Sequence, residues 1–304
     1  MNARLLATLL LFGAAPGAAA TPPAAKAAEP QGQVLPGAPV DLAGRDQVDA
    51  SVPAKYRDEV ASAQVEGAKL QQEDFAAWVA SNTLVHSGLR APGKATGWLA
   101  LPKDPLARTW KVSFTALSGE HSIVYADIDV DITRPPPKVQ MTAQGKGREL
   151  TADEKLLVRD RDLVARREDW LRCADDYNYS ASFRAGMKGR ETLIRALPAR
   201  HDQKLYLLGG FHEFSTPEAG GKAKQFQQTN TCLELPLPAN GIGFMVSHVR
   251  SDTPTLFHVF ANLSYGRPVY VKTSGRTWLV DGGRITVVDK KSVKSLKTQA
   301  PAAN

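Results

Sequence analysis

Residues 124–132 alternate between apolar and polar side chains more regularly than any other stretch of this chain. The apolar side chains of the segment share one face: Val124, Ala126, Ile128, Val130 and Ile132. Tyr125 and three aspartates occupy the opposite face. A period of two residues is typical of a strand that is buried on one side, so the segment predicts a half-buried strand whose acidic face meets solvent.

Short β-like runs lie on both sides of this strand. Residues 97–101 and 110–117 precede it, with a proline-containing turn between them. From residue 204 onward the chain predicts further strands over 205–208, 226–235, 243–249, 256–263, 269–273, 277–281 and 284–288. The last three are joined by Ser274-Gly275 and Gly282-Gly283, and short Gly-containing connections of this kind indicate β-hairpins.

Two segments have helical patterns. Residues 53–81 predict one or two amphipathic helices. The longest helix is expected to begin at Thr151, because Thr151 and Glu154 match a capping box. Apolar pairs then recur every seven residues as far as Trp170, and Cys173 follows on the same stripe. This stripe is expected to pack the helix against the element that carries Cys232.

Connections around that helix are expected to be irregular. The prolines at 135–137 should end the half-buried strand, and a polar loop should continue to Arg148. Tyr177-Asn178 should form the turn after the helix, since Asn tolerates the left-handed conformation. Strands, then one long helix, then more strands favour the α+β class over a doubly wound sheet. We therefore predict a mostly antiparallel sheet packed against one long amphipathic helix.

The beginning of the chain predicts export. Residues 1–20 have the pattern of a signal peptide, with Arg4, an apolar run too short to span a bilayer, and small residues at 18–20. The expected divisions are a signal peptide over 1–20, an Ala/Pro-rich disordered spacer over 21–48, a single α+β domain over 49–289 with a possible sub-boundary near 133–149, and a basic disordered tail over 290–304. The mature protein is expected to be soluble, periplasmic or secreted, and not membrane-spanning.

The net charge of +7 is concentrated in part at the C-terminal end. Lys290, Lys291, Lys294 and Lys297 crowd the final residues, with no acid after Asp289. No aromatic side chain interleaves with these lysines, so the stacking surface that single-stranded nucleic acids require is missing. We expect a solvated tail and no nucleic-acid partner.

The chain has two cysteines, Cys173 and Cys232, both in the expected mature protein. In an oxidising compartment such a pair favours a disulfide, and the alternative is two buried free thiols. The absence of a C-x-x-C motif excludes a thioredoxin-like redox site and a four-cysteine zinc site.

A set of short segments between Cys173 and Ile285 forms a recognisable pattern: Cys173 with Tyr177-Asn178, residues 205–208, Thr231-Cys232-Leu233, Pro254 with His258-Val259-Phe260, and Trp278-x-Val280-x-Gly282 up to Ile285. In these residues the chain resembles a family of uncharacterised exported proteobacterial proteins. The match covers less than half of the chain. It implies a shared fold and a Cys173–Cys232 bridge, and it implies no reaction. Lys222 stands where the family pattern has a histidine, so no role of that histidine carries over.

Several catalytic motifs begin in this sequence and fail. His212-Glu213 lacks the second histidine of H-E-x-x-H, because position 216 is Thr. The aspartates at 127, 129 and 131 lack the glycine and glutamate of a calcium loop, which leaves a solvated strand face as the favoured interpretation. Ser251-Asp252-Thr253 and Lys272-Thr273-Ser274-Gly275 resemble two boxes of the penicillin-recognising enzymes, but the nucleophile box S-x-x-K is absent.

His248 and His258 are the remaining candidates for chemistry, with Asp252 between them. Our first hypothesis is a non-catalytic envelope protein, a binding or accessory module whose partner is an unknown envelope protein or a small ligand. The alternative is a periplasmic hydrolase that uses His248, His258 and Asp252 as an acid–base cluster, with Glu213 as another possible acid. We expect the two imidazoles to lie apart, each held by its own strand, and we predict no cofactor and no metal site.

Overall fold

The computed structural model describes residues 37–186, 189–199, 205–228, 231–236 and 243–288. The expected signal peptide, the basic tail and most of the spacer lie outside these residues. In the described part of the chain, no helix is both long enough and apolar enough to cross a membrane.

The described residues form three four-stranded sheets and one two-stranded sheet. The strand orders are β1-β2-β3-β4, β5-β6-β8-β9, β11-β12-β13-β14 and β10-β7. The strands are β1 (Lys94–Pro102), β2 (Thr109–Ser118), β3 (His121–Asp131), β4 (Lys138–Glu149), β5 (Tyr177–Gly186), β6 (Gly189–Pro198), β7 (Leu205–Leu207), β8 (His212–Pro217), β9 (Lys224–Gln228), β10 (Glu234–Pro236), β11 (Phe244–Ser247), β12 (Val269–Lys272), β13 (Thr277–Asp281) and β14 (Arg284–Val288). Every pairing is antiparallel except that of β11 with β12. The predicted α+β class is confirmed.

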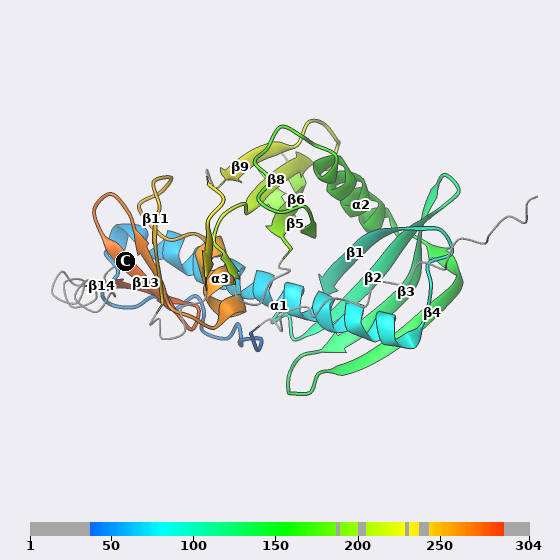
Figure 1. The fold of residues 1–304 in the computed structure, drawn as a ribbon, viewed down its shortest axis with the longest axis horizontal. Coiled ribbons are helices and arrows are strands. Elements are labelled where there is room, and N and C mark those ends of the chain that lie inside the picture. The colour runs from blue at the N-terminus through cyan, green and yellow to red at the C-terminus, as the bar shows by residue number, and fades with distance from the viewer. Residues whose placement is uncertain (1–36, 187–188, 200–204, 229–230, 237–242, 289–304) are drawn as a thin grey trace, which may run out of the picture. The chain divides into compact units, whose positions relative to one another are not determined.

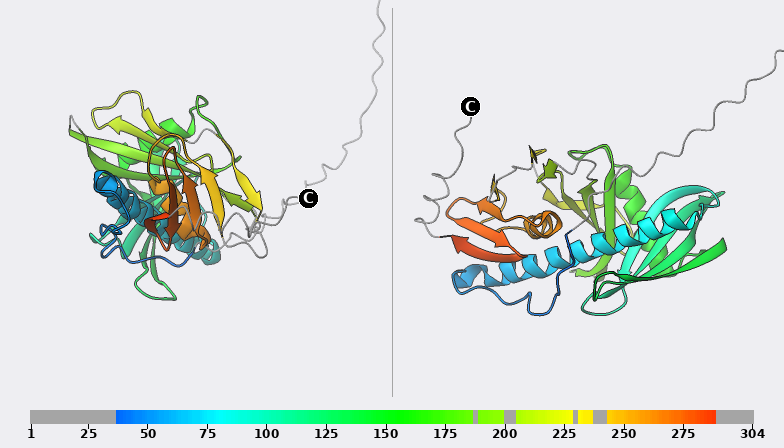
Figure 2. Two further views of the ribbon diagram at one scale, coloured as in Figure 1. Left: turned by 90° about the vertical axis from the view of Figure 1, so that its left-hand side faces the viewer. Right: turned by 60° about the horizontal axis from the view of Figure 1, so that its bottom comes forward.

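The long helix of the fold is α1 (Arg57–Ser87), which follows a short 3-10 turn, η1 (Ala54–Tyr56). It runs beside β13 and β14 at one end and against the β1–β4 sheet at the other (Figures 1 and 2). Its side chains enter three hydrophobic clusters, for example at Val60, Leu70 and Leu84. The expected long helix at 151–173 is therefore not the longest one.

Buried glutamines on α1 hold the segment before it. The side-chain amide of Gln71 donates to the Gly37 carbonyl and that of Gln72 to the Val40 carbonyl, both at 2.6 Å. Gln64 donates to two carbonyls of residues 45–47 and accepts from the Ile285 N–H. Buried amides need such partners, so these bonds fix residues 37–47 on the body. The sequence had assigned this stretch to the spacer.

The β1–β4 sheet contains the strand that the sequence predicted most clearly. The alternating face of β3 is interrupted by a bulge between Val124 and Ala126. Val124 consequently packs into a different cluster from Ala126. The prediction of a polar loop up to Arg148 is wrong, because β4 pairs with β3 over these residues. Its many polar side chains reflect its place at the edge of the sheet.

The acidic face of β3 is partly covered rather than fully solvated. Asp127 is buried, and Arg148 donates to both of its carboxylate oxygens at 2.8 Å. Arg148 also binds both oxygens of Glu154 at the start of α2 (Ala152–Ala165). Burial raises the pKa of Asp127, but the hydrogen bonds from Arg148 and Ser113 outweigh it and leave that pKa below its usual value.

Helix α2 begins as predicted and ends earlier. The capping box of Thr151 and Glu154 is present. The helix stops at Ala165, and the Arg172 guanidinium donates to the Ala165 carbonyl from the loop that follows. Trp170 is buried in the same cluster as the α2 side chains, as expected, but it reaches that cluster from the loop. Cys173 lies in this loop too and not on a helical stripe.

The residues after this loop form a β-hairpin that was not predicted from the sequence. Strand β5 starts at Tyr177 and pairs with β6 along its whole length. The expected turn at Tyr177-Asn178 is therefore wrong. The predicted 226–235 strand is also two strands, β9 and β10, in different sheets. By contrast, Gly282 and Gly283 form the predicted two-residue turn between β13 and β14, both with positive φ.

Residues 256–263 are helical and not a strand. They lie in α3 (Leu256–Tyr265), which starts after Thr255 and ends at Gly266 with φ 61°. Helix α3 is buried against α1, and Gly67 allows this approach, because a Cβ there would lie 2.6 Å from a Val259 carbon. His258 and Asn262 are spaced by one helical turn, but the segment is short and rich in apolar and aromatic side chains that also suit a buried strand, which explains the wrong prediction.

Candidate functional site: the strand-end pocket

The connection β11–α3–β12 makes the one parallel strand pair among the described residues. Parallel strands point their carboxyl ends to the same edge of a sheet, which is where ligands bind in many α/β arrangements. A pocket of about 510 Å3 lies at that edge, and we call it the strand-end pocket. Its lining residues are Ser247, His248, Val249, Arg250, Ser251, Asp252, Lys272, Thr273 and Ser274.

His248 is half-buried and directs one ring nitrogen at Ser251. The Ser251 hydroxyl donates its single proton to the Thr253 carbonyl, 2.6 Å away. The 3.0 Å contact between Ser251 Oγ and His248 Nε2 therefore needs a proton on the imidazole nitrogen. His248 donates to Ser251 in this arrangement and is not placed to deprotonate it. Burial, and then the charge of Arg250, lower the pKa of His248, so the ring is neutral at pH 7.

His258 caps the helix on which it lies. Its Nδ1 accepts a hydrogen bond from the Thr255 N–H at 3.0 Å, at the first turn of α3. Burial, and then the neighbouring His248, lower the pKa of His258 to about 3. The two imidazoles meet edge to face with 5.0 Å between their centroids. The expectation that they lie apart, each in its own strand, is wrong, because the parallel connection brings the end of β11 to the start of α3.

Asp252 lies in the strand-end pocket but is engaged elsewhere. Its two carboxylate oxygens accept hydrogen bonds from Ser274 at 2.8 Å and from Tyr56 at 3.1 Å. These bonds hold the pKa of Asp252 below its usual value. Lys55 and Arg276 lie against the Tyr56 ring and add positive charge beside the carboxylate. Neither of these contacts reaches an imidazole, so His248, His258 and Asp252 lie in one region but do not form a triad.

The described residues contain no group of three or more His, Cys, Asp or Glu side chains that could hold a metal ion. His248, His258 and Asp252 form no such group. What the strand-end pocket does present is positive charge, since Arg250 and Lys272 are both exposed at its wall. Asp252 is its single acidic side chain.

Sequence reasoning missed Arg250 and Lys272 as ligand-binding candidates. The two segments Ser251-Asp252-Thr253 and Lys272-Thr273-Ser274-Gly275 do line the same pocket, although the S-x-x-K box that would make them part of a penicillin-recognising site is absent. The available signal was a polar segment after each of two strands. The two segments lie together because a helix connects the two parallel strands. The sequence had instead predicted a strand at 256–263.

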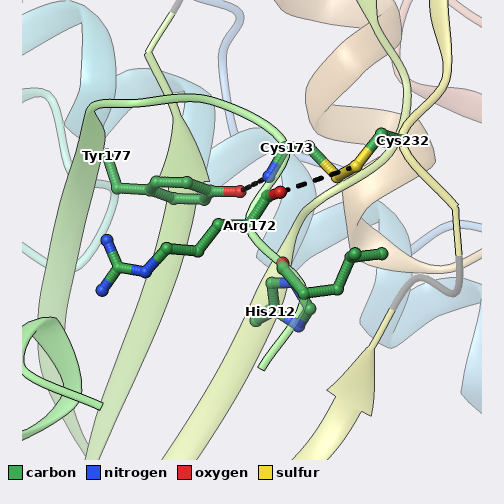
Figure 3. The surroundings of a disulfide bond; sticks show 6 residues. Arg172, Cys173, Tyr177, His212 and Cys232 are labelled. Atoms are coloured by element: carbon green, nitrogen blue, oxygen red, sulfur yellow. Dashed lines mark hydrogen bonds between the residues drawn. A yellow bond between two sulfur atoms is a disulfide. The ribbon is translucent and has the colours of Figure 1, made fainter. Parts of the chain in front are cut away.

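The other predicted site, the cysteine pair, is a disulfide. Cys173 and Cys232 are bonded, with 5.1 Å between their Cα atoms. Figure 3 shows the Tyr177 hydroxyl next to the Cys173 N–H, which donates to it at 2.7 Å. The bridge links the loop after α2 to the segment before β10, 59 residues later. The predicted bridge is confirmed, and the predicted helix around Cys173 is not.

His212, the start of the failed H-E-x-x-H motif, is a core residue near this bridge. It is fully buried on β8, and the Trp170 ring meets its imidazole edge to face at 4.7 Å. Its Nδ1 lies 2.8 Å from the Gln225 amide nitrogen, and its Nε2 lies 2.8 Å from the Leu171 carbonyl oxygen. An amide donor on one nitrogen and a carbonyl acceptor on the other suit the neutral ring, and burial lowers the pKa of His212 accordingly.

Comparisons of this chain with protein-family models, with curated proteins and with solved structures found no match. The resemblance to exported proteobacterial proteins therefore stays a prediction.

Proposed function

We propose that this chain is an exported, non-catalytic binding protein that holds a small anionic ligand in the strand-end pocket. The observation that carries the proposal is the convergence of Arg250 and Lys272 on a pocket with one acid, Asp252. That acid is already bonded to Tyr56 and Ser274. A volume of about 510 Å3 is in the range of pockets for small organic molecules.

The hydrogen bonds of Ser251 favour binding over hydrolysis. A serine nucleophile needs a base that accepts its proton and a third group that orients the base. Here the Ser251 proton goes to a backbone carbonyl, and the oxygens of Asp252 go to Tyr56 and Ser274. His258 accepts from the backbone of Thr255 and stabilises the helix start. These bonds support the binding hypothesis over the hydrolase alternative.

The export part of the proposal rests on residues 1–20 and on the disulfide, which suits an oxidising compartment. Intact-mass analysis of the protein from its host should show a chain that begins near Thr21. Protein that retains Met1 in the cytoplasm would contradict export.

The binding part is tested by titration calorimetry with inorganic phosphate and with citrate, and with glycerol as the uncharged control. We expect both anions to bind, glycerol not to bind, and the affinity to fall as salt is added. Lys272→Ala should weaken anion binding about tenfold, the effect of one charge-assisted hydrogen bond.

Lys94→Ala is the matched control, because Lys94 is also an exposed lysine on a strand and does not line the pocket. It should leave the affinity unchanged. Equal affinities in the two variants, or no heat with either anion, would overturn the proposal. Ester hydrolysis that disappears in Ser251→Ala would support the hydrolase alternative instead.

A further inference from the structure

A second pocket, of about 380 Å3, lies between α1 and the β5–β6–β8 part of the neighbouring sheet. We call it the α1 pocket. It shares no lining residue with the strand-end pocket. The lining residues that matter here are Glu66, Lys69, Arg184, Leu193, Arg195, Glu213 and Leu256.

Arg195 forms the buried base of the α1 pocket. Its side chain is 6% exposed, and it donates from Nε to Glu213 at 2.6 Å and from Nη2 to Glu66 at 2.7 Å. Glu213 is equally buried, whereas the Glu66 side chain is 37% exposed at the mouth. A guanidinium carries five N–H donors, so these two bonds leave part of Arg195 available to a ligand.

Both carboxylates can also accept further hydrogen bonds. Glu66 and Glu213 each use only Oε2 toward Arg195, and within the described part of the chain their Oε1 atoms have no hydrogen bond. Lys69, one turn along α1 from Glu66, is half-buried, and no described residue pairs with its ammonium. The α1 pocket thus holds unused acceptors and unused donors together. Two acidic and three basic side chains line it, and the third base, Arg184, is paired with Glu191 on β6.

A contribution to stability does not by itself explain why these charged side chains are buried together. A buried ion pair contributes little compared with apolar side chains of the same volume, because both charges lose their hydration. The same pocket has an apolar wall from Leu193 on β6 and Leu256 on α3. Charges of both signs beside an apolar wall match a small molecule that has the same three features.

We propose that the α1 pocket binds a small zwitterion of the α-amino acid class with an apolar side chain. The ligand's carboxylate would lie toward Lys69 and Arg195. Its ammonium group would lie toward the unused oxygens of Glu66 and Glu213. Its side chain would pack on Leu193 and Leu256. This site is independent of the anion proposed for the strand-end pocket.

The test compares three ligands by titration calorimetry on the whole folded protein. L-leucine carries both charges, leucinamide lacks the carboxylate, and N-acetyl-leucine lacks the ammonium. We expect leucine to bind and each analogue to bind at least about tenfold more weakly. An analogue that binds as tightly as leucine, or no binding of leucine at all, would overturn the proposal.

Two variants locate the site. Lys69→Met should weaken leucine binding at least about tenfold, and Lys155→Met, which replaces an exposed lysine on α2, should not. Circular dichroism and the thermal midpoint check that both variants are folded. Leucine affinity that is unchanged in folded Lys69→Met would place the ligand elsewhere and reject the site. Phosphate titration of the same variant should be unaffected, which separates this test from that of the strand-end pocket.

Discussion

Glu73 on α1 accepts a hydrogen bond from the Ser180 hydroxyl on β5, with 2.8 Å between Oε2 and Oγ. The carboxyl is buried, and its other oxygen has no hydrogen bond within the described residues. Burial raises the pKa of Glu73 to about 7, although Ser180 and the charge of Arg195 act in the opposite direction. A carboxyl of this kind is largely protonated below neutral pH.

The stability of the protein should therefore depend on pH through Glu73. A carboxyl with a higher pKa in the folded state holds its proton more tightly there, so it stabilises at low pH and this contribution is lost as the pH rises through 7. Relative to Glu73→Gln, the wild type should lose about 2 to 3 kcal/mol between about pH 5 and pH 8. Urea denaturation at each pH measures this difference. Glu120→Gln, in an exposed turn, should run parallel to the wild type.

His258 should change the stability of the protein with pH in the opposite direction. Its pKa is lower in the folded state, about 3 against 6.5, so the unfolded chain binds the proton first and stability falls as the pH drops below about 6.5. His258→Asn keeps an acceptor for the Thr255 N–H and removes this titration. Between about pH 7 and pH 5 the wild type should lose about 2 kcal/mol relative to this variant. A difference that does not change with pH would mean that His258 is freely hydrated.

Trp170→Ala should cost about 3 to 5 kcal/mol of unfolding free energy, the usual range for a large buried aromatic side chain. The indole meets Tyr177, His212 and Phe214 edge to face, and its loss would open the cluster beneath the disulfide. Leu171→Ala is the neighbouring control, because that side chain is 37% exposed. A loss below about 1 kcal/mol for Trp170→Ala would show that the indole faces solvent.

Reduction of the disulfide should lower the unfolding free energy by about 4 kcal/mol, because the bridge closes a loop with a sequence separation of 59 in the unfolded chain. Denaturant midpoints with and without reductant measure this. The double variant Cys173→Ser/Cys232→Ser should be insensitive to reductant. Two thiols that titrate in native, unreduced protein would contradict the bridge.

The features that the sequence predicted well depend on neighbouring residues. The turn at Gly282-Gly283 and the capping box of Thr151 and Glu154 need only a few adjacent side chains, and both are present. The burial of Trp170 was also predictable from its apolar neighbours. Its place in a loop was not, because the helix end is capped by Arg172, whose guanidinium returns to Ala165 from seven residues away.

The prediction of the candidate site depended on one helix. His248, His258 and Asp252 were identified as chemistry-bearing residues, but their geometry followed from whether residues 256–263 form a strand or a helix. The segment is short and packs against α1 and the β11–β14 sheet, and its apolar and aromatic composition suits a buried strand as well as a helix. With the helix in place, the polar segments after β11 and β12 meet, and Lys272 becomes a candidate together with His248.

Helix α1 places Val60, Leu70 and Leu84 in separate clusters on one continuous rod. Each residue of an α-helix turns the chain by about 100° and advances it about 1.5 Å. Deletion of a single residue between Leu70 and Ala76 would leave the first part of the helix in place and rotate Ala76, Ala80 and Leu84 off their cluster. Helix α1 can therefore change length only by steps that restore the angular phase of both ends.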